Sequence, residues 1–286
     1  MHMTSTANPQ PAVKENPTTR LDDGHPDYVV ALARGLAVIQ AFTESSPEMT
    51  LSEVAQATGM SPATARRALL TLQSLGYVGA NRRRFLLLPK VLSLGAAYLG
   101  SMNLRDVVQP FLQEVAERFR DSVSLAILEG DSVVYLAHVP SSRRITFRAS
   151  VGYRLPVHCT SLGLALLAHA PEPQQEAVLA KAPFQKYTPM TLTEADGLRA
   201  ALNQVREQGY ALQDSQLELG VLSIAVPVRD AQRRVIAAIN CSTESSRASQ
   251  QDLVSERLPV LHNAAALIES ALMRAPALAH SIVAAT

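Results

Sequence analysis

Apolar side chains recur every three or four residues where the organised part of the chain begins. This helical spacing predicts an amphipathic first helix, whose apolar positions are Val30, Leu32, Ala33, Leu36, Ile39 and Phe42. Residues 1–27 are instead rich in Pro, Thr, Asn and Asp and carry almost no large apolar side chains. We expect them to form a disordered tail, because such a segment cannot bury enough surface to offset its ordering entropy.

Two shorter amphipathic helices follow, each with its own start signal. Thr50 and Glu53 have the spacing of a capping box at the start of the first, and Gly59 suits the left-handed residue that ends it. Ser61 and Pro62 fit the N-cap and the first position of the second. Its apolar stripe consists of Ala65, Leu69, Leu72 and Leu75. Two short helices joined by a tight turn that contains glycine predict a helix-turn-helix.

A basic hairpin is predicted directly after these helices. Apolar runs at 77–78 and 85–88 have the length of two short strands. The turn between them carries three consecutive arginines, which are Arg82, Arg83 and Arg84. A hairpin in this place is typical of a wing, so residues 28–89 are predicted to form a winged helix-turn-helix domain.

Charge is concentrated on this small domain. The whole chain of 286 residues has 26 basic and 25 acidic residues, a formal net charge of +1, which excludes a uniformly basic nucleic-acid coat and an acidic tail protein. From Thr50 through Lys90, however, six basic residues accompany the single acid Glu53, a local balance of +5. With 47% hydrophobic residues, the chain can fill the cores of about two domains.

The rest of the chain mixes helices and strands. Pro89 begins a helix, and residues 90–103 are predicted to form a linker helix. Residues 104–275 predict an α+β domain around one sheet, and residues 276–286 a C-terminal tail. The expected helices of this domain cover 107–119, 160–168, 172–182, 194–208 and 253–272, and its expected strands cover 123–128, 133–139, 145–155, 221–228 and 235–240.

Cysteine usage and hydropathy indicate a cytoplasmic protein. Two cysteines, Cys159 and Cys241, are too few for a disulfide scaffold or an all-cysteine zinc site, and their apolar neighbours predict buried thiols. No stretch approaches the ~18 apolar residues of a membrane helix. The N-terminus lacks the basic and apolar pattern of a secretory signal. We therefore expect a soluble protein that does not contact membranes.

The second helix of the helix-turn-helix and the wing are the candidate surface for double-stranded DNA. The N-terminal end of such a helix enters the major groove, where arginine can form two hydrogen bonds with guanine. Wing arginines would add phosphate contacts. The candidate DNA-binding residues are Ser61, Ala63, Thr64, Arg66, Arg67, Thr71, Arg82, Arg83 and Arg84. The alternative is a small protein-interaction module whose arginines are only solvated.

Residues 154–163 are a second candidate site. They lead from a predicted strand into the start of a helix, where free backbone N–H groups and the hydroxyls of Thr160 and Ser161 could hold an anion. Ordinary helix capping by the same hydroxyls is an equally good interpretation.

Catalysis is not expected, although His158, Cys159 and Ser161 lie close together in the sequence. A nucleophile needs a base that hydrogen-bonds it and an acid that orients the base, and the sequence contains no Gly-x-Ser-x-Gly elbow. The seven histidines have no metal-ligand spacing, and no glycine fingerprint for a nucleotide is present. We therefore expect no enzyme activity, no metal and no cofactor.

Several ordered motifs are similar to those of the IclR family of bacterial transcriptional regulators. The resemblance covers about residues 28–272, and the motif around Arg66 together with Ala97-Tyr98-Leu99 is most similar to the branch that controls aromatic-acid catabolism. The matching motifs are Ala33-Arg34-Gly35-Leu36, Leu51-Ser52-Glu53-Val54-Ala55, Thr58-Gly59, Ser61-Pro62-Ala63-Thr64-Ala65-Arg66-Arg67-Ala68-Leu69, Leu75-Gly76-Tyr77-Val78, Val91-Leu92-Ser93-Leu94-Gly95, Arg154-Leu155-Pro156, Thr160-Ser161-x-Gly163, Leu217-Glu218-Leu219-Gly220 and Ser223-Ile224-Ala225-Val226-Pro227.

The resemblance implies a GAF-like effector-binding domain after the winged helix-turn-helix, and homodimers or homotetramers on palindromic or repeated operators. It also implies an effector pocket at the start of the 160–168 helix. The implied effector-binding residues are the backbone amides of Ser161 and Leu162, the apolar Leu155 and Val221, the polar Gln213, Ser223, Asn240 and Ser242, and His158. Two positions depart from the family pattern, because Leu164 and Leu222 stand where the family often has arginine.

The function predicted from the sequence is a DNA-binding transcriptional regulator controlled by a small carboxylate, with an aromatic acid of a catabolic pathway as the expected effector. The alternative is a ligand-binding or enzymatic body that carries an incidental DNA-binding head. A third possibility is an architectural DNA-binding protein whose body only oligomerises. The family resemblance leaves open the identity of the effector and whether the protein activates or represses.

Overall fold

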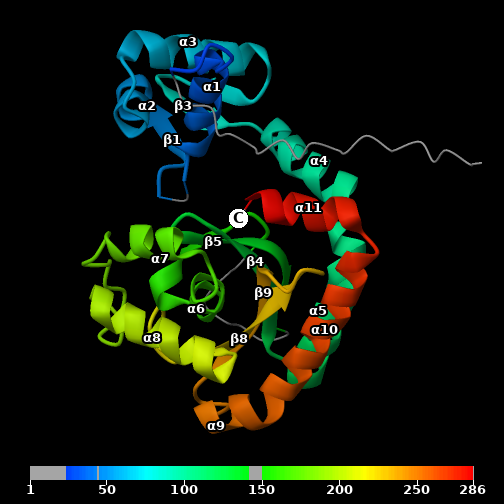
Figure 1. Cartoon of the computed structure of the whole chain (residues 1–286). Helices are drawn as coiled ribbons and strands as arrows, with labels where there is room; N and C mark the ends of the chain where they lie inside the picture. The colour runs from blue at the N-terminus through cyan, green and yellow to red at the C-terminus, as the bar shows by residue number, and fades with distance from the viewer. Residues whose placement is uncertain (1–23, 44, 142–149, 286) are drawn as a thin grey trace, which may run out of the picture. The chain divides into compact units, whose positions relative to one another are not determined.

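The computed structural model describes residues 24–43, 45–141 and 150–285 (Figure 1). The chain divides into two compact units, with the boundary between Leu94 and Gly95. Most of the tail predicted at 1–27, and part of the strand predicted at 145–155, lie outside the described residues. Each unit has its own hydrophobic core and is described separately.

Residues 24–43 and 45–88 of the first unit form three α-helices and a small sheet. Its strands are antiparallel in the order β1-β3-β2. The two-residue connection between β2 and β3 makes the predicted wing, and the short β1 was not predicted because three residues carry too little alternation. The elements are α1 (Val30–Gln40), β1 (Glu48–Thr50), α2 (Leu51–Thr58), α3 (Pro62–Ser74), β2 (Val78–Asn81) and β3 (Arg84–Leu87).

Local capping sets the geometry of the helix-turn-helix. The Glu53 backbone N–H donates to Thr50 Oγ1 at 3.3 Å, and the Thr50 N–H donates to Glu53 Oε2 at 2.6 Å, which forms the predicted capping box. Gly59 ends α2 with φ of +65°, a conformation that costs glycine little. Ser61 then caps α3 by accepting from the Thr64 N–H. Apolar residues from all three helices, including Val38, Val54 and Leu69, form the core.

Two helical elements lead into the second unit. The turn η1 (Pro89–Val91) and helix α4 (Leu92–Met102) occupy the region predicted as a linker helix, and the boundary between the two units lies within α4. Asn103 has φ of +49° and separates α4 from the long helix α5 (Leu104–Phe119). This left-handed residue interrupts the helical path between α4 and α5.

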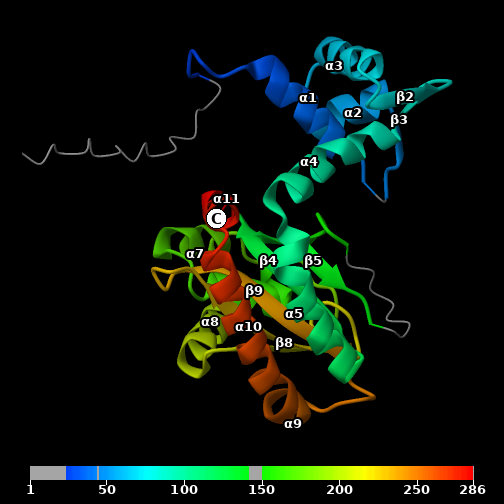
Figure 2. The same ribbon diagram turned by 90° about the vertical axis from the view of Figure 1, so that its right-hand side faces the viewer.

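The second unit is built around one antiparallel sheet in the order β6-β5-β4-β9-β8-β7. Helices α5, α10 and α11 lie on one side of it, and α6, α7 and α8 lie on the other (Figures 1 and 2). Its strands are β4 (Ser122–Glu129), β5 (Ser132–Val139), β6 (Arg154–Pro156), β7 (Ala211–Asp214), β8 (Val221–Arg229) and β9 (Val235–Glu244). Its remaining helical elements are η2 (Val157–Cys159), α6 (Ser161–Leu167), α7 (Glu172–Leu179), α8 (Ala195–Gln208), α9 (Gln250–Asp252), the π-helical turn η3 (Leu253–Arg257), α10 (Leu258–Met273) and α11 (Pro276–Ala285).

The two faces of this sheet differ in chemistry. Successive side chains of a strand point to opposite faces, so Leu222, Ile224 and Val226 of β8 join the core under α5 and α10. Ser223 and Ala225 alternate with them and face α6. The polar residue Ser223 therefore lies on the α6 face of the sheet, where it can contribute to a polar binding site.

The prediction of a C-terminal tail at 276–286 was wrong for the described residues. They form helix α11, and Leu278 and Ile282 are 1% and 0% exposed in the core that also contains α5 and α10. Their spacing of four residues places both side chains on one helix face. This spacing was the available signal, but it is too short a pattern to stand out in an alanine-rich segment.

The predicted fold class is confirmed, with an N-terminal winged helix-turn-helix and a C-terminal unit of mixed helices and strands. In the described part of the chain, helices are too short or too polar to cross a membrane.

Candidate functional site

Helix α3 presents two arginines to solvent at its N-terminal half. Its inner stripe of Ala65, Leu69 and Leu72 is buried, so Arg66 and Arg67 are turned outward and exposed. Within the described residues, neither guanidinium takes part in an ion pair or a hydrogen bond, and both are free for a ligand. The other candidate DNA-binding residues of α3 and its N-cap differ in exposure: Ser61, Ala63 and Thr71 are exposed, and Thr64 is half-buried.

The hydroxyls near these arginines are partly engaged by the helix itself. Ser61 Oγ and Thr64 Oγ1 lie 2.9 Å apart, and Thr71 Oγ1 donates to the Arg67 carbonyl at 2.9 Å. A hydroxyl can rotate and still accept a further hydrogen bond. The polar surface of α3 is therefore compatible with the predicted base and phosphate contacts.

The three wing arginines have different environments. Arg82 and Arg83 form the two-residue tip between β2 and β3, and both are exposed; Arg82 has φ of +56°. Arg84 is turned back onto its own domain, where Nη1 donates to the Glu48 carbonyl at 2.7 Å and lies 3.4 Å from Glu53 Oε2. The structure therefore gives Arg84 a role in joining β1, β3 and α2, whereas Arg82 and Arg83 are available at the tip.

Glu53 is the acid at the centre of this arrangement. The Thr50 backbone N–H lowers the pKa of the Glu53 carboxyl most, followed by the Thr50 hydroxyl, and Arg84 lowers it further. Lys90 is also engaged internally, because its Nζ donates to the Leu75 carbonyl at 2.9 Å at the end of α3. Part of the positive charge predicted for the DNA surface thus stabilises the domain.

The second candidate site is a pocket between α6 and the sheet, which we call the effector pocket. Strand register assembles its polar floor from residues far apart in the sequence. One cross-strand row runs through Gln213, Ser223, Ser242 and Ser122, on β7, β8, β9 and β4 in turn. A neighbouring row on β9, β4 and β5 consists of Asn240, Ser124 and His138.

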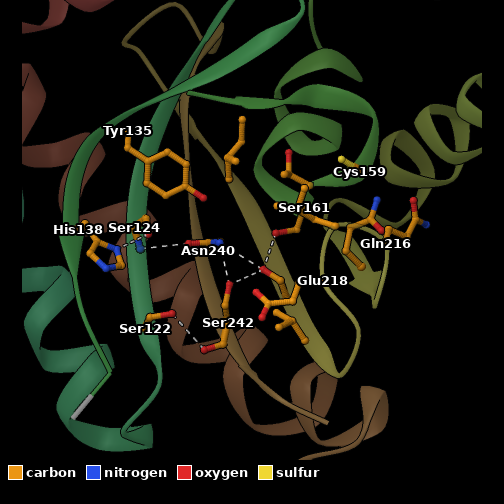
Figure 3. A pocket seen from close by; sticks show the side chains of 16 residues that line it. Ser122, Ser124, Tyr135, His138, Cys159, Ser161, Gln216, Glu218, Asn240 and Ser242 are labelled. Carbon is orange, nitrogen blue, oxygen red and sulfur yellow. Dashed lines mark hydrogen bonds between the residues drawn. The ribbon is translucent and has the colours of Figure 1, made fainter. Parts of the chain in front are cut away.

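A chain of hydrogen bonds joins the two rows to helix α6 (Figure 3). Ser223 Oγ lies 2.6 Å from Ser161 Oγ and 2.8 Å from Ser242 Oγ. Asn240 Nδ2 donates to both Ser223 Oγ, at 3.2 Å, and Ser242 Oγ, at 3.0 Å, while Asn240 Oδ1 accepts from the Ser124 N–H. These contacts fix the side chains of the floor before any ligand binds.

Figure 3 shows labelled side chains on two sides of this floor. Tyr135 and His138 stand on one side, with the β4–β5 hairpin, whereas Ser161 and Glu218 stand on the other. Apolar surface comes from Leu155, Leu217 and Val221. The described lining residues are Ser122, Ser124, Tyr135, His138, Leu155, Cys159, Thr160, Ser161, Gln213, Gln216, Leu217, Glu218, Val221, Ser223, Asn240 and Ser242.

The start of α6 is packed tightly against the preceding turn η2. Thr160 caps α6 by accepting from the Gly163 N–H at 3.1 Å, as the capping interpretation predicted. A Cβ on Gly163 would collide with the Val157 backbone and the Thr160 hydroxyl. Glycine at this position therefore allows the close approach that forms one end of the effector pocket.

Burial favours the neutral forms of two lining side chains, His138 and Cys159. Desolvation lowers the pKa of His138, whose Nδ1 lies 2.9 Å from Ser124 Oγ. Burial raises the pKa of the Cys159 thiol to about 12, so this cysteine is not a thiolate near neutral pH. In the described part of the chain, neither lysine nor arginine lines the pocket. The arrangement is therefore suited to hydrogen bonding, and nucleophilic chemistry has no support here.

Most of the predicted effector-binding residues line the effector pocket. His158 and Leu162 are the exceptions among the side chains. His158 stacks on Phe184, with ring centroids 4.9 Å apart, in a separate surface hollow, and the Leu162 side chain is fully buried in the core. The predicted residues whose side chains line the pocket are Leu155, Ser161, Gln213, Val221, Ser223, Asn240 and Ser242.

Several lining residues were missed by the sequence analysis. Ser122 and Ser124 alternate with the buried Val123 and Leu125, so polar residues on one face of an otherwise apolar strand were a usable signal. Tyr135 and His138 gave no such signal, since a β-bulge between Leu125 and Ala126 alters the register of their strand pair. The loop residues Gln216, Leu217 and Glu218 have no periodicity from which a position could be predicted.

The two departures from the family pattern lie in the hydrophobic cores. Leu222 is 2% exposed on the sheet face opposite the pocket, and Leu164 is 3% exposed among residues of α6 and α8. Neither side chain lines the effector pocket. Among the described residues there is also no cluster of histidine, cysteine and carboxylate side chains that could hold a metal ion.

Comparisons with known proteins match each of the two units to a domain of the same family. The IclR helix-turn-helix domain matches residues 31–82, and the domain described as "Bacterial transcriptional regulator IclR C-terminal" matches residues 96–270. The chain is 40% identical to the Pca regulon regulatory protein of Pseudomonas putida, over 88% of this chain and 87% of that protein. It is 35% identical to the p-hydroxybenzoate hydroxylase transcriptional activator of Acinetobacter baylyi, over 84% and 90% of the two chains.

A solved structure shows the same architecture with a ligand. It is an IclR homolog from Microbacterium hydrocarbonoxydans complexed with 4-hydroxybenzoate, with 29% identity and a TM-score of 0.70, covering 85% of this chain and 99% of that one. The matched domains, the relatives and the shared fold have one explanation: this chain belongs to the IclR family of bacterial transcriptional regulators.

Proposed function

We propose that a small aromatic carboxylate binds in the effector pocket and controls DNA binding by the helix-turn-helix unit. The observation that carries the proposal is the pocket itself, a buried floor of serines and asparagine in a sheet whose opposite face is apolar. These polar groups are buried at low cost because they form hydrogen bonds with one another, and a few convergent polar groups with apolar walls are typical of ligand sites. The complex of a relative with 4-hydroxybenzoate supports an aromatic acid as the ligand.

The donors for the carboxylate are neutral groups. The hydroxyl of Ser161 or of Ser242 can donate outward while both hydrogen bonds through Ser223 remain, and the backbone amides of Ser161 and Leu162 lie at the start of α6. Hydrogen bonds to an ionised acceptor are stronger than those between neutral groups. Apolar contacts with Leu155 and Val221 would bury the faces of the ring.

On the DNA side, Arg66 and Arg67 contact base edges and Arg82 and Arg83 contact the backbone. The exposure of these arginines, which have no intramolecular partner among the described residues, supports these contacts, since α3 is the helix that such domains place in the major groove. The protein acts as a homodimer, or as a dimer of dimers, on palindromic or repeated half-sites roughly 34–36 Å apart or a multiple of that. Acting on a bacterial chromosome requires a cytoplasmic location.

A thermal-shift titration with defined acids tests the effector. The panel contains 4-hydroxybenzoate, protocatechuate, terephthalate, β-ketoadipate and pyruvate. A ligand at about a hundred times its dissociation constant should stabilise the protein by roughly 2.7 kcal/mol. Stabilisation by an aromatic acid, together with a change in the affinity for DNA taken from upstream of the gene, is the expected result. DNA binding that ignores every acid would favour an architectural role, and turnover of a bound acid would favour an enzymatic body.

A further inference from the structure

One side chain of the effector pocket has polar atoms without partners. Gln213 is only 4% exposed, and neither its Nε2 nor its Oε1 has a hydrogen-bond partner within the part of the chain that the structure describes. Its strand β7 pairs with β8 so that Gln213 lies opposite Ser223, on the face that bears α6. A buried amide without protein partners bears its desolvation cost until another molecule forms hydrogen bonds with it. Such a group points to a ligand.

The amide makes a specific chemical demand. Nε2 donates hydrogen bonds and Oε1 only accepts them, so the matching group must both accept and donate. An ionised carboxylate offers acceptors alone and would place its charge against Oε1. A hydroxyl offers both functions. Two adjacent ring hydroxyls match best, because one can donate to Oε1 while the other accepts from Nε2.

The charge of the pocket is a second, independent reason to expect a hydrogen-bond donor on the ligand. The carboxylate of Glu218 lines it, and among the described lining residues no lysine or arginine offsets that charge. Glu218 is half-buried, and its side chain has no hydrogen-bond or ion-pair partner among the described residues. A ligand carboxylate near it is repelled, whereas a phenolic hydroxyl can donate to it. The wall formed by β7 and the following loop therefore favours a hydrogen-bond donor.

We propose that Gln213 is the specificity-determining residue of the effector pocket and that, with Glu218, it recognises hydroxyl groups on the ring of the effector. The effector is then a hydroxylated aromatic monocarboxylate, with its carboxylate on the serine hydroxyls. This inference rests on the proposed function and deepens it, because an aromatic carboxylate without a ring hydroxyl would leave Gln213 unsatisfied. A second carboxylate in place of the hydroxyl would meet Glu218 without a cation to offset it.

Isothermal titration calorimetry on the full chain tests the inference with four probes that share one ring. These are benzoate, 4-hydroxybenzoate, 3,4-dihydroxybenzoate and terephthalate. The wild-type protein should bind the hydroxylated acids at least about tenfold more tightly than benzoate, since a site built to bond a hydroxyl discriminates strongly against its absence. Terephthalate should bind no better than benzoate.

Gln213→Leu should remove the discrimination. Leucine has a similar size without the polar atoms, so the ratio of affinities for 4-hydroxybenzoate and benzoate should fall to within about twofold to threefold, mainly through weaker binding of 4-hydroxybenzoate. The variant should also unfold at a temperature no lower than the wild type in the absence of ligand, because replacing unsatisfied polar atoms by apolar ones is neutral or stabilising. Glu218→Gln should relieve the penalty on terephthalate.

A matched substitution separates these effects from a general disturbance. Gln204→Leu makes the same chemical change at an exposed position of α8 outside the pocket, and it should retain the wild-type ratio. If Gln213→Leu folds, binds the ring acids and keeps the hydroxyl preference, the inference is wrong while the proposed function stands. If wild-type protein binds none of the four acids, the proposed effector class and the inference both fail.

Discussion

The two candidate sites of this protein use hydrogen-bond donors of opposite kinds. At Arg66 and Arg67 on α3, and at Arg82 and Arg83 on the wing tip, the donors are charged and exposed, and they have no internal partner among the described residues. In the effector pocket, they are neutral, buried and tied to one another, as at Ser223 and Asn240. Exposed charges attract a polyanion over a distance and are screened by salt. Buried neutral donors act only at contact, so shape and hydrogen-bond pattern decide what they bind.

The largest effect is expected from damaging the pocket without touching the DNA surface. Gly163→Ala would force a Cβ into the Val157 backbone, which cannot move aside as a flexible side chain could. We expect a loss of about 3 kcal/mol in the stability of the second unit, with loss of effector binding. Thermal unfolding and calorimetry measure both. A variant with unchanged stability and ligand affinity would show that α6 and η2 are not packed as described.

The next effect concerns the exposed arginines of α3. Arg67→Ala should weaken binding to the operator by about 1–3 kcal/mol and relax selection at one base position. Competition assays with operator variants measure this, and effector binding by the same protein serves as the control. Equal losses of affinity for operator DNA and random DNA would instead show that Arg67 contacts a phosphate.

The wing allows a sharper comparison between free and engaged arginines. Replacing Arg82 and Arg83 by alanine should reduce the slope of log affinity against log salt by about 2, because two phosphate contacts are lost. Arg84→Ala should leave that slope nearly unchanged, since its guanidinium is held by Glu48 and Glu53, and should cost up to about 1 kcal/mol in stability. A salt slope that falls as much for Arg84→Ala would contradict the assigned contacts.

The smallest effect is a pH dependence confined to the second unit. Burial lowers the pKa of His138, His158 and His169 below the unfolded value of about 6.5, so the folded state binds fewer protons than the unfolded state. Stability from this source is fully present above about pH 6.5 and is lost as the pH falls toward the folded pKa values. Each histidine should contribute a fraction of the ~1.4 kcal/mol per pH unit of a fully buried group.

Thermal unfolding between pH 7.5 and 5.5 measures this dependence. His138→Gln should reduce the slope of stability against pH. An unchanged slope would show that His138 does not contribute to the pH dependence.

The same contrast explains what could be predicted from the sequence. The helix-turn-helix was predictable because its signals are local, with Thr50, Glu53 and Gly59 all within ten residues of one another. Arg66 and Arg67 followed from the apolar stripe, which faces inward and leaves them outside. Arg84 follows Arg82 and Arg83 directly in the sequence, but its ion pair with Glu53 spans 31 positions and no local pattern indicates it.

The effector pocket depends on pairings between distant strands. Gln213, Ser223 and Asn240 were assigned through family motifs, and their meeting on one face follows from the sheet order β4-β9-β8-β7. His158 was included in the predicted effector-binding set, but its ring stacks on Phe184 outside the pocket. Local periodicity indicates which face a residue takes only where a strand is regular, and a bulge at Leu136 interrupts the regularity of β5.

Fluorescence anisotropy of operator DNA, titrated with 4-hydroxybenzoate, tests the link between the two sites most directly. We predict that the acid changes the operator affinity of the wild-type protein, and that Ser223→Ala binds the operator equally well without ligand but requires at least about tenfold more acid for the same change. An unchanged response of Ser223→Ala, or a wild-type protein whose operator affinity ignores every aromatic acid, would contradict the account.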